Sequence, residues 1–252
     1  MKVRLDKLIL QRGLAPSRER AQALVLAGRV LVNEQKLETS GASVEDDVAL
    51  RILGDDMPYV SRGGLKLARA LEHWKIDVRD KVCVDVGAST GGFTDCVLQN
   101  GAAEVIAVDT GYGQMDFKIR QDPRVRLLEK TNARYLTRDL TREIGSETAD
   151  LIVMDVSFIS ATLVLPAVVA TAFPNPGERR GRQIVVLVKP QFEAGREQVG
   201  KGGIVRDPVA QAAAVERVRE CLVRLGCSSS DVIDSPILGA EGNREFLLRG
   251  VF

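Results

Sequence analysis

The chain has 252 residues, of which 45% are hydrophobic and 27% are charged, and its formal net charge is +1. This composition is that of an ordinary globular protein, and it argues against a disordered chain or a fibrous repeat. The length suits one large domain together with a smaller one.

The cysteines and the apolar segments bear on metal binding and on the cell compartment. The four cysteines include no CxxC pair and the chain has a single histidine, so we expect neither a metal site nor disulfides. No apolar segment follows Met1, which predicts a cytoplasmic chain with reduced thiols. The longest apolar stretch, 159–173, is shorter than the roughly 20 residues of a membrane span. It contains Pro166 and predicts a loop followed by a buried helix.

The amino end is locally basic, because residues 1–36 contain eight Lys and Arg against three Asp and Glu. Apolar residues recur at helical spacing over 5–9 and again over 21–25, with a Gly- and Pro-containing break between them. This pattern predicts two helices joined by a turn. Two short segments of alternating apolar residues follow and predict strands. We therefore expect a small α+β domain over 1–55.

Basic side chains gather on the two predicted helices. Ser17 is the predicted N-cap of the second helix, which places Arg18 and Arg20 in a first turn where cations oppose the helix dipole. An external anion would offset that effect. We therefore predict an RNA-binding face whose phosphate contacts come from Arg4, Lys7, Arg18 and Arg20. A solvated charged face is the alternative.

A turn-rich segment, GDDMPYVSRGG, marks the boundary between the domains. We assign the linker to 56–63 and the second domain to 64–252. In that domain, buried segments that end in a polar residue alternate with helical ones, and they read KVCVDV, AEVIAVD, LIVMD and QIVVLVK. This order predicts an α/β fold with a Rossmann-like, mostly parallel sheet, to which REFLLRGVF adds one antiparallel strand. Ligands of such sheets bind outside the carboxyl ends of the strands.

The first of these strands runs into a glycine-rich turn, DVGASTGG at 85–92, and then into a helix. The glycine order GxxxGG differs from the GxGxxG of dinucleotide sites, which disfavours a pyrophosphate ligand. Asp85 suits a ligand with a positive amino group or sulfonium. Asp109, at the end of the next strand, suits a pair of ribose hydroxyls. Both features fit S-adenosylmethionine.

The predicted cofactor-binding residues lie at or near the carboxyl ends of these strands. They are Asp85, Gly87, Ala88, Ser89, Gly91, Gly92, Phe93, Asp109, Asn132 and Asp155. Asn132 is assigned to the adenine edge, although a plain turn residue explains it equally well. Phe93 and Phe158 are interpreted as core residues, and base stacking by Phe158 or Tyr112 is the alternative.

Charged side chains also stand at this edge of the predicted sheet. Asp155 and Lys189 end neighbouring strands and so can meet, and Glu245 opens the antiparallel strand at the same edge. Lys66 lies in a predicted helix over 65–74. An isolated lysine there is typical of a surface residue. Its position after two glycines near the domain boundary raises the alternative that it points into the crevice.

Five ordered blocks, together with the basic amino end, resemble the TlyA family. The blocks are SRGGLKLARAL, DVGASTGGFTD, MDVSFIS, LVKPQFE and GNREFLL. That family pairs an RNA-binding domain of the ribosomal-protein S-four type with an FtsJ-like, Rossmann-type methyltransferase domain. The resemblance covers essentially the whole chain, with Thr90-Gly91-Gly92 where FtsJ-like turns commonly have Pro-Gly-Gly.

The resemblance implies S-adenosylmethionine-dependent 2′-O-methylation of ribosomal RNA, with cytidine in ribosomal subunits as the target. It also implies a catalytic set of Lys66, Asp155, Lys189 and Glu245, with Glu241 as the competing acid. In our interpretation Lys189 accepts the hydroxyl proton, Asp155 orients it, and Lys66 with Glu245 holds the ribose. We expect a monomer that does not have a membrane as a partner. An RNA-binding ribosome-assembly protein without catalysis and a membrane-active haemolysin are the alternative functions.

Overall fold

The computed structural model describes residues 2–15, 17–53, 57–137, 149–239 and 241–252. The chain forms two compact units, Met1–Met57 and Pro58–Phe252, which are described separately.

The described residues of the smaller unit form two helices and five short strands. Helices α1 (Leu5–Gln11) and α2 (Arg18–Leu26) bury the apolar positions that predicted them, including Ile9 and Leu24. The side chain of Ser17 accepts the backbone N–H of Arg20, so the predicted N-cap is confirmed. The strands form two antiparallel sheets, β1 (Lys2–Arg4) with β4 (Ser43–Glu45), and β2 (Val30–Val32) between β3 (Gln35–Lys36) and β5 (Leu50–Ile52).

The larger unit contains a seven-stranded sheet, which confirms the predicted fold class. Its strands, in spatial order, are β11 (Ser229–Asp234), β12 (Phe246–Val251), β10 (Gln183–Val188), β9 (Leu151–Met154), β6 (Val82–Val86), β7 (Glu104–Val108) and β8 (Val125–Leu128). The pairs from β10 to β8 are parallel, and β12 is antiparallel to both of its neighbours. The expected antiparallel strand is therefore β12, and β11 is an additional edge strand.

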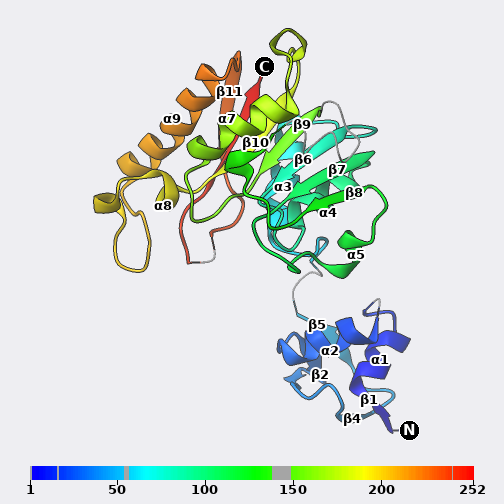
Figure 1. The fold of residues 1–252 in the computed structure, drawn as a ribbon. Coiled ribbons are helices and arrows are strands. Elements are labelled where there is room, and N and C mark those ends of the chain that lie inside the picture. Colours follow the sequence, from blue (N-terminus) through cyan, green and yellow to red (C-terminus); the bar gives the residue numbers. More distant parts are fainter. Residues whose placement is uncertain (1, 16, 54–56, 138–148, 240) are drawn as a thin grey trace. The chain divides into compact units, whose positions relative to one another are not determined.

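Helices cover both faces of this sheet (Figure 1). Helices α3 (Gly63–Trp74) and α4 (Gly92–Gln99) pack on one face, and α7 (Ala161–Ala172) and α9 (Pro208–Arg224) pack on the other. The shorter elements are α5 (Phe117–Arg120), α8 (Pro190–Glu193), η1 (Ala133–Tyr135), η2 (Pro176–Glu178) and η3 (Arg196–Gln198). Helix α7 is the buried helix expected within 159–173.

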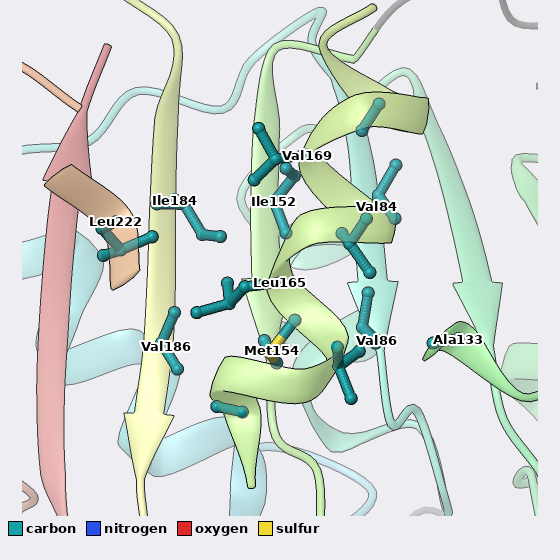
Figure 2. Close-up of a cluster of buried hydrophobic side chains, with 14 of the residues drawn as sticks. Val84, Val86, Ala133, Ile152, Met154, Leu165, Val169, Ile184, Val186 and Leu222 are labelled. Carbon is teal, nitrogen blue, oxygen red and sulfur yellow. The ribbon is translucent and has the colours of Figure 1, made fainter. Parts of the chain in front are cut away.

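The core on the α7 face shows why the strands are apolar on both sides. Alternate residues of one strand, such as Ile152 and Met154 of β9, enter the core under α7, while Leu151 and Val153 enter the core under α3 and α4. Figure 2 shows Leu165 and other α7 side chains lying over the first set. A strand that is buried on both faces needs a continuous apolar run, as is typical of parallel sheets.

Candidate functional site

The glycine turn after β6 brings several chain segments close together. Gly87 has φ +85°, and a Cβ on it would lie 2.5 Å from the backbone oxygen of Asp155. A Cβ on Gly92 would lie 2.2 Å from Oγ of Ser61, just before α3. The two glycines therefore let the ends of β6 and β9, and the starts of α4 and α3, pack closely. Ligand contacts of Gly87, Gly91 and Gly92 remain a prediction.

A cavity of about 620 Å³, the large cavity, opens at the carboxyl ends of β6, β7 and β9. Its lining includes Gly87, Ser89, Asp109, Asn132 and Asp155 from the predicted cofactor set. The volume lies within the range of about 300–1,000 Å³ that is usual for small-molecule and cofactor sites.

Asp109 is fixed in this cavity by backbone hydrogen bonds. Its carboxylate accepts the N–H of Ser89 at 2.8 Å and of Gly111 at 2.6 Å. An ionised carboxylate has about four acceptor positions, so it retains capacity for the hydroxyls of a ribose. The side-chain oxygen of Asn132 caps η1 by accepting the N–H of Arg134. Asn132 therefore has the turn role that we left open, and its contact with adenine remains a prediction.

Asp85 lies beneath the turn and is fully buried. It is absent from the lining of the large cavity, and its Oδ2 accepts the hydroxyl of Thr94 at 2.6 Å. Oδ1 is buried and has no hydrogen-bond partner among the described residues. Burial raises the pKa of Asp85 to about 7, the hydrogen bond from Thr94 opposes the rise, and the charge of Asp155 adds to it. Such a group suits charge balance under a cationic ligand.

The four predicted catalytic residues form two ion pairs. Nζ of Lys66 lies 2.5 Å from Oε2 of Glu245, with both side chains largely buried. Lys66 is 8% exposed, so it is not the surface residue that an isolated lysine in that helix predicts. Nζ of Lys189 lies 2.6 Å from Oδ1 of Asp155 as an ion pair, and it donates a hydrogen bond of 2.7 Å to Oγ of Ser157.

Two smaller cavities join these pairs to the large cavity. The central cavity, about 170 Å³, is lined by Lys66, Asp155 and Lys189 together with the predicted Ala88 and Phe93. The aromatic cavity, about 260 Å³, is lined by Lys189, Glu245, the competing acid Glu241 and two phenylalanines, Phe158 and Phe192. Ser157 lines all three cavities. The pairs and the predicted cofactor residues thus belong to one connected region.

Sequence reasoning missed Ser157 and placed Phe158 wrongly. Phe93 is 3% exposed and packs in the core, as interpreted, but Phe158 is 91% exposed and has φ +64°. Their position in the sequence could have indicated a site role, since Ser157 and Phe158 lie just after the predicted strand that ends in Asp155. Glu193 was also missed. It is buried and accepts the Ser160 hydroxyl and the N–H of Ala161 at the start of α7.

In the smaller unit, the predicted phosphate-binding arginines have an internal partner. Asp6 is fully buried and accepts hydrogen bonds from Arg4 at 3.0 Å, Arg18 at 3.0 Å and Gln22 at 2.8 Å. The hydrogen bond from Arg4, followed by those from Gln22 and Arg18, lowers the pKa of Asp6 well below its usual value, against the effect of burial. Asp6 supplies a negative charge beside Arg18, so the helix dipole alone does not require an external anion, and the phosphate contacts of Arg4 and Arg18 remain a prediction. Lys7 is exposed.

Two further observations concern metals and membranes. Within the described ranges, no group of three His, Cys, Asp or Glu residues could hold a metal ion. No helix in the described part of the chain is both long and apolar enough to span a membrane.

The seven-stranded sheet with one antiparallel strand, and a polar site at the ends of its parallel strands, is typical of Rossmann-like methyltransferases. Residues 59–252 match the FtsJ-like methyltransferase family model, and residues 3–46 match the S4 domain model.

The chain belongs to the TlyA family of FtsJ-like methyltransferases. It is 45% identical to the 16S/23S rRNA (cytidine-2'-O)-methyltransferase TlyA of Mycobacterium tuberculosis, covering 98% of this chain and 89% of that protein. It is 46% identical to YqxC of Bacillus subtilis, a protein named as an rRNA methyltransferase, over 98% of this chain and 85% of that protein. A solved structure from Streptococcus thermophilus, named as a hemolysin, aligns with a TM-score of 0.73 at 43% identity, covering 99% of this chain and 88% of that one.

Proposed function

We propose that the protein is an S-adenosylmethionine-dependent 2′-O-methyltransferase that acts on cytidine in ribosomal RNA. The observation that carries this proposal is the central cavity, where Lys66, Asp155 and Lys189 meet the glycine turn. Membership of a methyltransferase family and the 45% identity to TlyA support the substrate class. We further propose that the protein acts in the cytoplasm as a monomer and without a metal.

The residues present fit S-adenosylmethionine. Asp109 and Asn132 in the large cavity would hold the adenosine, and Gly87, Ala88 and Ser89 would hold the amino acid part near the buried charge of Asp85. The bound cofactor supplies an electrophilic methyl group. Ser157 lines all three cavities, which supports the proposal that the methyl group and its acceptor would meet near this residue.

Lys189 is the proposed base for the ribose 2′-hydroxyl. Asp155 and Ser157 contact its Nζ and so fix the position of the nitrogen that would take the proton. Lys66 is held by Glu245 and lines the same central cavity, where it would donate to the ribose oxygen. Each lysine has its own carboxylate. Lys189 would accept the hydroxyl proton only as a neutral amine, so its ammonium proton would first pass to Asp155 or to solvent. Alignment of the hydroxyl would supply much of the rate acceleration.

The smaller unit is proposed to bind RNA. Because Arg4 and Arg18 also hold Asp6, their substitution would alter the unit itself as well as its charge. Lys7 and Arg20 complete the predicted phosphate contacts. Lys7→Ala is the cleanest test, because Lys7 is exposed and its side chain is not one of those that hold Asp6. The loss of one phosphate contact should reduce the slope of log K against log salt concentration by about one.

The test combines methyl-labelled S-adenosylmethionine with isolated ribosomal subunits, followed by mapping of alkali-resistant linkages. We expect label on 2′-oxygens of cytidine. Lys189→Ala should abolish turnover and keep cofactor binding, whereas Lys118→Ala, at an exposed lysine on α5, should leave both unchanged. Label on bases alone, or loss of cofactor binding in Lys189→Ala, would overturn the assignment.

A further inference from the structure

The aromatic cavity has the features of a nucleobase pocket. Phe158 and Phe192 lie on its wall, with ring centroids 5.5 Å apart and planes inclined by 53°. Phe158 is 91% exposed and adopts a left-handed backbone conformation, which is costly for a bulky residue and tends to persist at functional sites. An exposed aromatic face that a fold holds in this way can stack on a base.

The aromatic cavity lies next to Lys189, the proposed general base, because residues close to it in the sequence line the cavity. Lys189 directly follows β10 and lines the aromatic cavity, and Gln191 lies two residues further on, in α8. A nucleoside whose 2′-hydroxyl lies at Nζ of Lys189 therefore has the aromatic cavity within reach of its base. The volume of about 260 Å³ is slightly below the range of about 300–1,000 Å³ for a complete small-molecule site, which suits one part of a larger ligand, such as a nucleobase.

The polar lining of the cavity combines the donor Lys189 with several acceptors. Oε1 of Gln191 is buried and has no hydrogen-bond partner among the described residues. Glu241 adds a carboxylate, which when ionised only accepts hydrogen bonds. The third carboxylate on the wall, Glu245, is engaged by Lys66. A buried acceptor without a donor is unfavourable, so this wall suits a ligand that brings N–H groups.

We propose that Gln191, assisted by Glu241, reads the exocyclic amino group of the target base and thereby selects cytosine over uracil. The amino group of cytosine donates hydrogen bonds, whereas the oxygen at the same position of uracil would face two acceptors. A carboxamide can rotate and present its nitrogen instead, but the carboxylate of Glu241 cannot. This inference rests on the proposed function and adds the residues that determine its base specificity.

The experiment uses the full chain and the ribosomal RNA fragment that carries the mapped target. Three versions of the fragment hold cytidine, uridine or pyrimidin-2-one riboside, which lacks the amino group, at the target position. Single-turnover rates at saturating S-adenosylmethionine give the preference for cytidine. We expect the unmodified protein to prefer cytidine by about 10-fold to 100-fold, the range of a well-formed base contact.

Variants of Gln191 then separate acceptor chemistry from shape. Gln191→Met keeps the length of the side chain without its amide, and should reduce the preference to within about 3-fold. Gln191→Glu keeps an acceptor that cannot rotate and should retain the preference. Glu241→Gln should lower the preference by a smaller factor. Gln121→Met, at an exposed glutamine that follows α5, should leave it unchanged.

The outcomes also distinguish this inference from the proposed function. Equal rates on the three fragments, or an unchanged preference in Gln191→Met, would overturn the role of Gln191 while 2′-O-methylation itself persists. If the unmodified protein forms no 2′-O-methyl group on any RNA, both the function and this inference fall.

Discussion

The buried pair between Lys66 and Glu245 allows structural and catalytic contributions to be separated. The two residues are 179 positions apart in the sequence, and their ion pair connects the first turn of α3 to the residue just before β12. The side chain of Lys66 is 11% exposed and that of Glu245 is 3% exposed. Glu245→Gln would leave the ammonium of Lys66 buried beside a neutral amide.

The expected magnitude follows from this burial. Removing one partner of a buried ion pair costs about 3–5 kcal/mol, because the remaining charge lacks compensation. Replacing both partners by apolar residues of similar volume is often close to neutral. Glu245→Gln should therefore destabilise the larger unit by at least about 3 kcal/mol, whereas the double variant Lys66→Met, Glu245→Leu should recover most of that loss. The double variant should nevertheless have no methyltransferase activity, because it lacks both members of the pair.

The assay is urea unfolding followed by the fluorescence of Trp74, the single tryptophan, which lies in the larger unit. Asp234→Asn is the matched control, because it breaks the exposed ion pair between Asp234 and Arg244, which should cost less than about 1 kcal/mol. If Glu245→Gln cost no more than this control, or if the double variant were active, the assignment of a buried, functional pair would be refuted.

Three other predictions concern single side chains. Ser157→Ala should slow single-turnover methylation about 10-fold to 100-fold, since a hydrogen bond to a charged group contributes about 1.5–3 kcal/mol. Calorimetry should show unchanged cofactor affinity, and an equal fall in affinity would contradict the role of Ser157 in positioning Lys189. Asp85 has a pKa raised to about 7, so its contribution to stability is fully present below about pH 4 and is lost as pH rises through 7; Trp74 fluorescence should show that Asp85→Asn removes this pH dependence, and a dependence that persists would contradict it. Asp6 has a lowered pKa, so its contribution is present above about pH 4 and is lost at lower pH; Asp6→Asn should speed amide exchange in α1 and α2 at neutral pH, and unchanged exchange would exclude a stabilising role.

The arrangement of the site could be predicted where the sheet topology determines it. Strands β9 and β10 are parallel neighbours in register, with Met154 opposite Val186, so the polar residues that follow them reach the same edge. Strand β12 runs antiparallel to β10 and begins at that edge, which brings Glu245 to it. Apolar runs and their polar ends are enough to predict these positions.

Other features depend on contacts that have no local signal. The partnership of Asp6 with Arg4 and Arg18 joins β1, α1 and α2, and a charge pattern alone cannot distinguish it from a face open to phosphate. Strand β11, SSDVID, lies at the sheet edge, where one side meets solvent and few apolar residues are needed. Phe158 is exposed and has a left-handed backbone; its position after β9 places it near the site, but the apolar side chain alone does not distinguish exposure from core packing.

The placement of Lys66 depends on close packing at glycines beside the first turn of α3. A Cβ on Gly64 would lie 2.2 Å from the ring of Tyr59, and a Cβ on Gly92 would lie 3.0 Å from the backbone nitrogen of Gly64. The absence of a Cβ on Gly92 lets α3 begin directly against the start of α4, and its absence on Gly64 makes room for Tyr59. Lys66 lies in the first turn of α3, so this close approach sets the height at which its side chain meets Glu245. The glycine pair that begins α3 and Gly92, at the end of the turn after β6, are therefore two halves of one packing contact beside the buried Lys66.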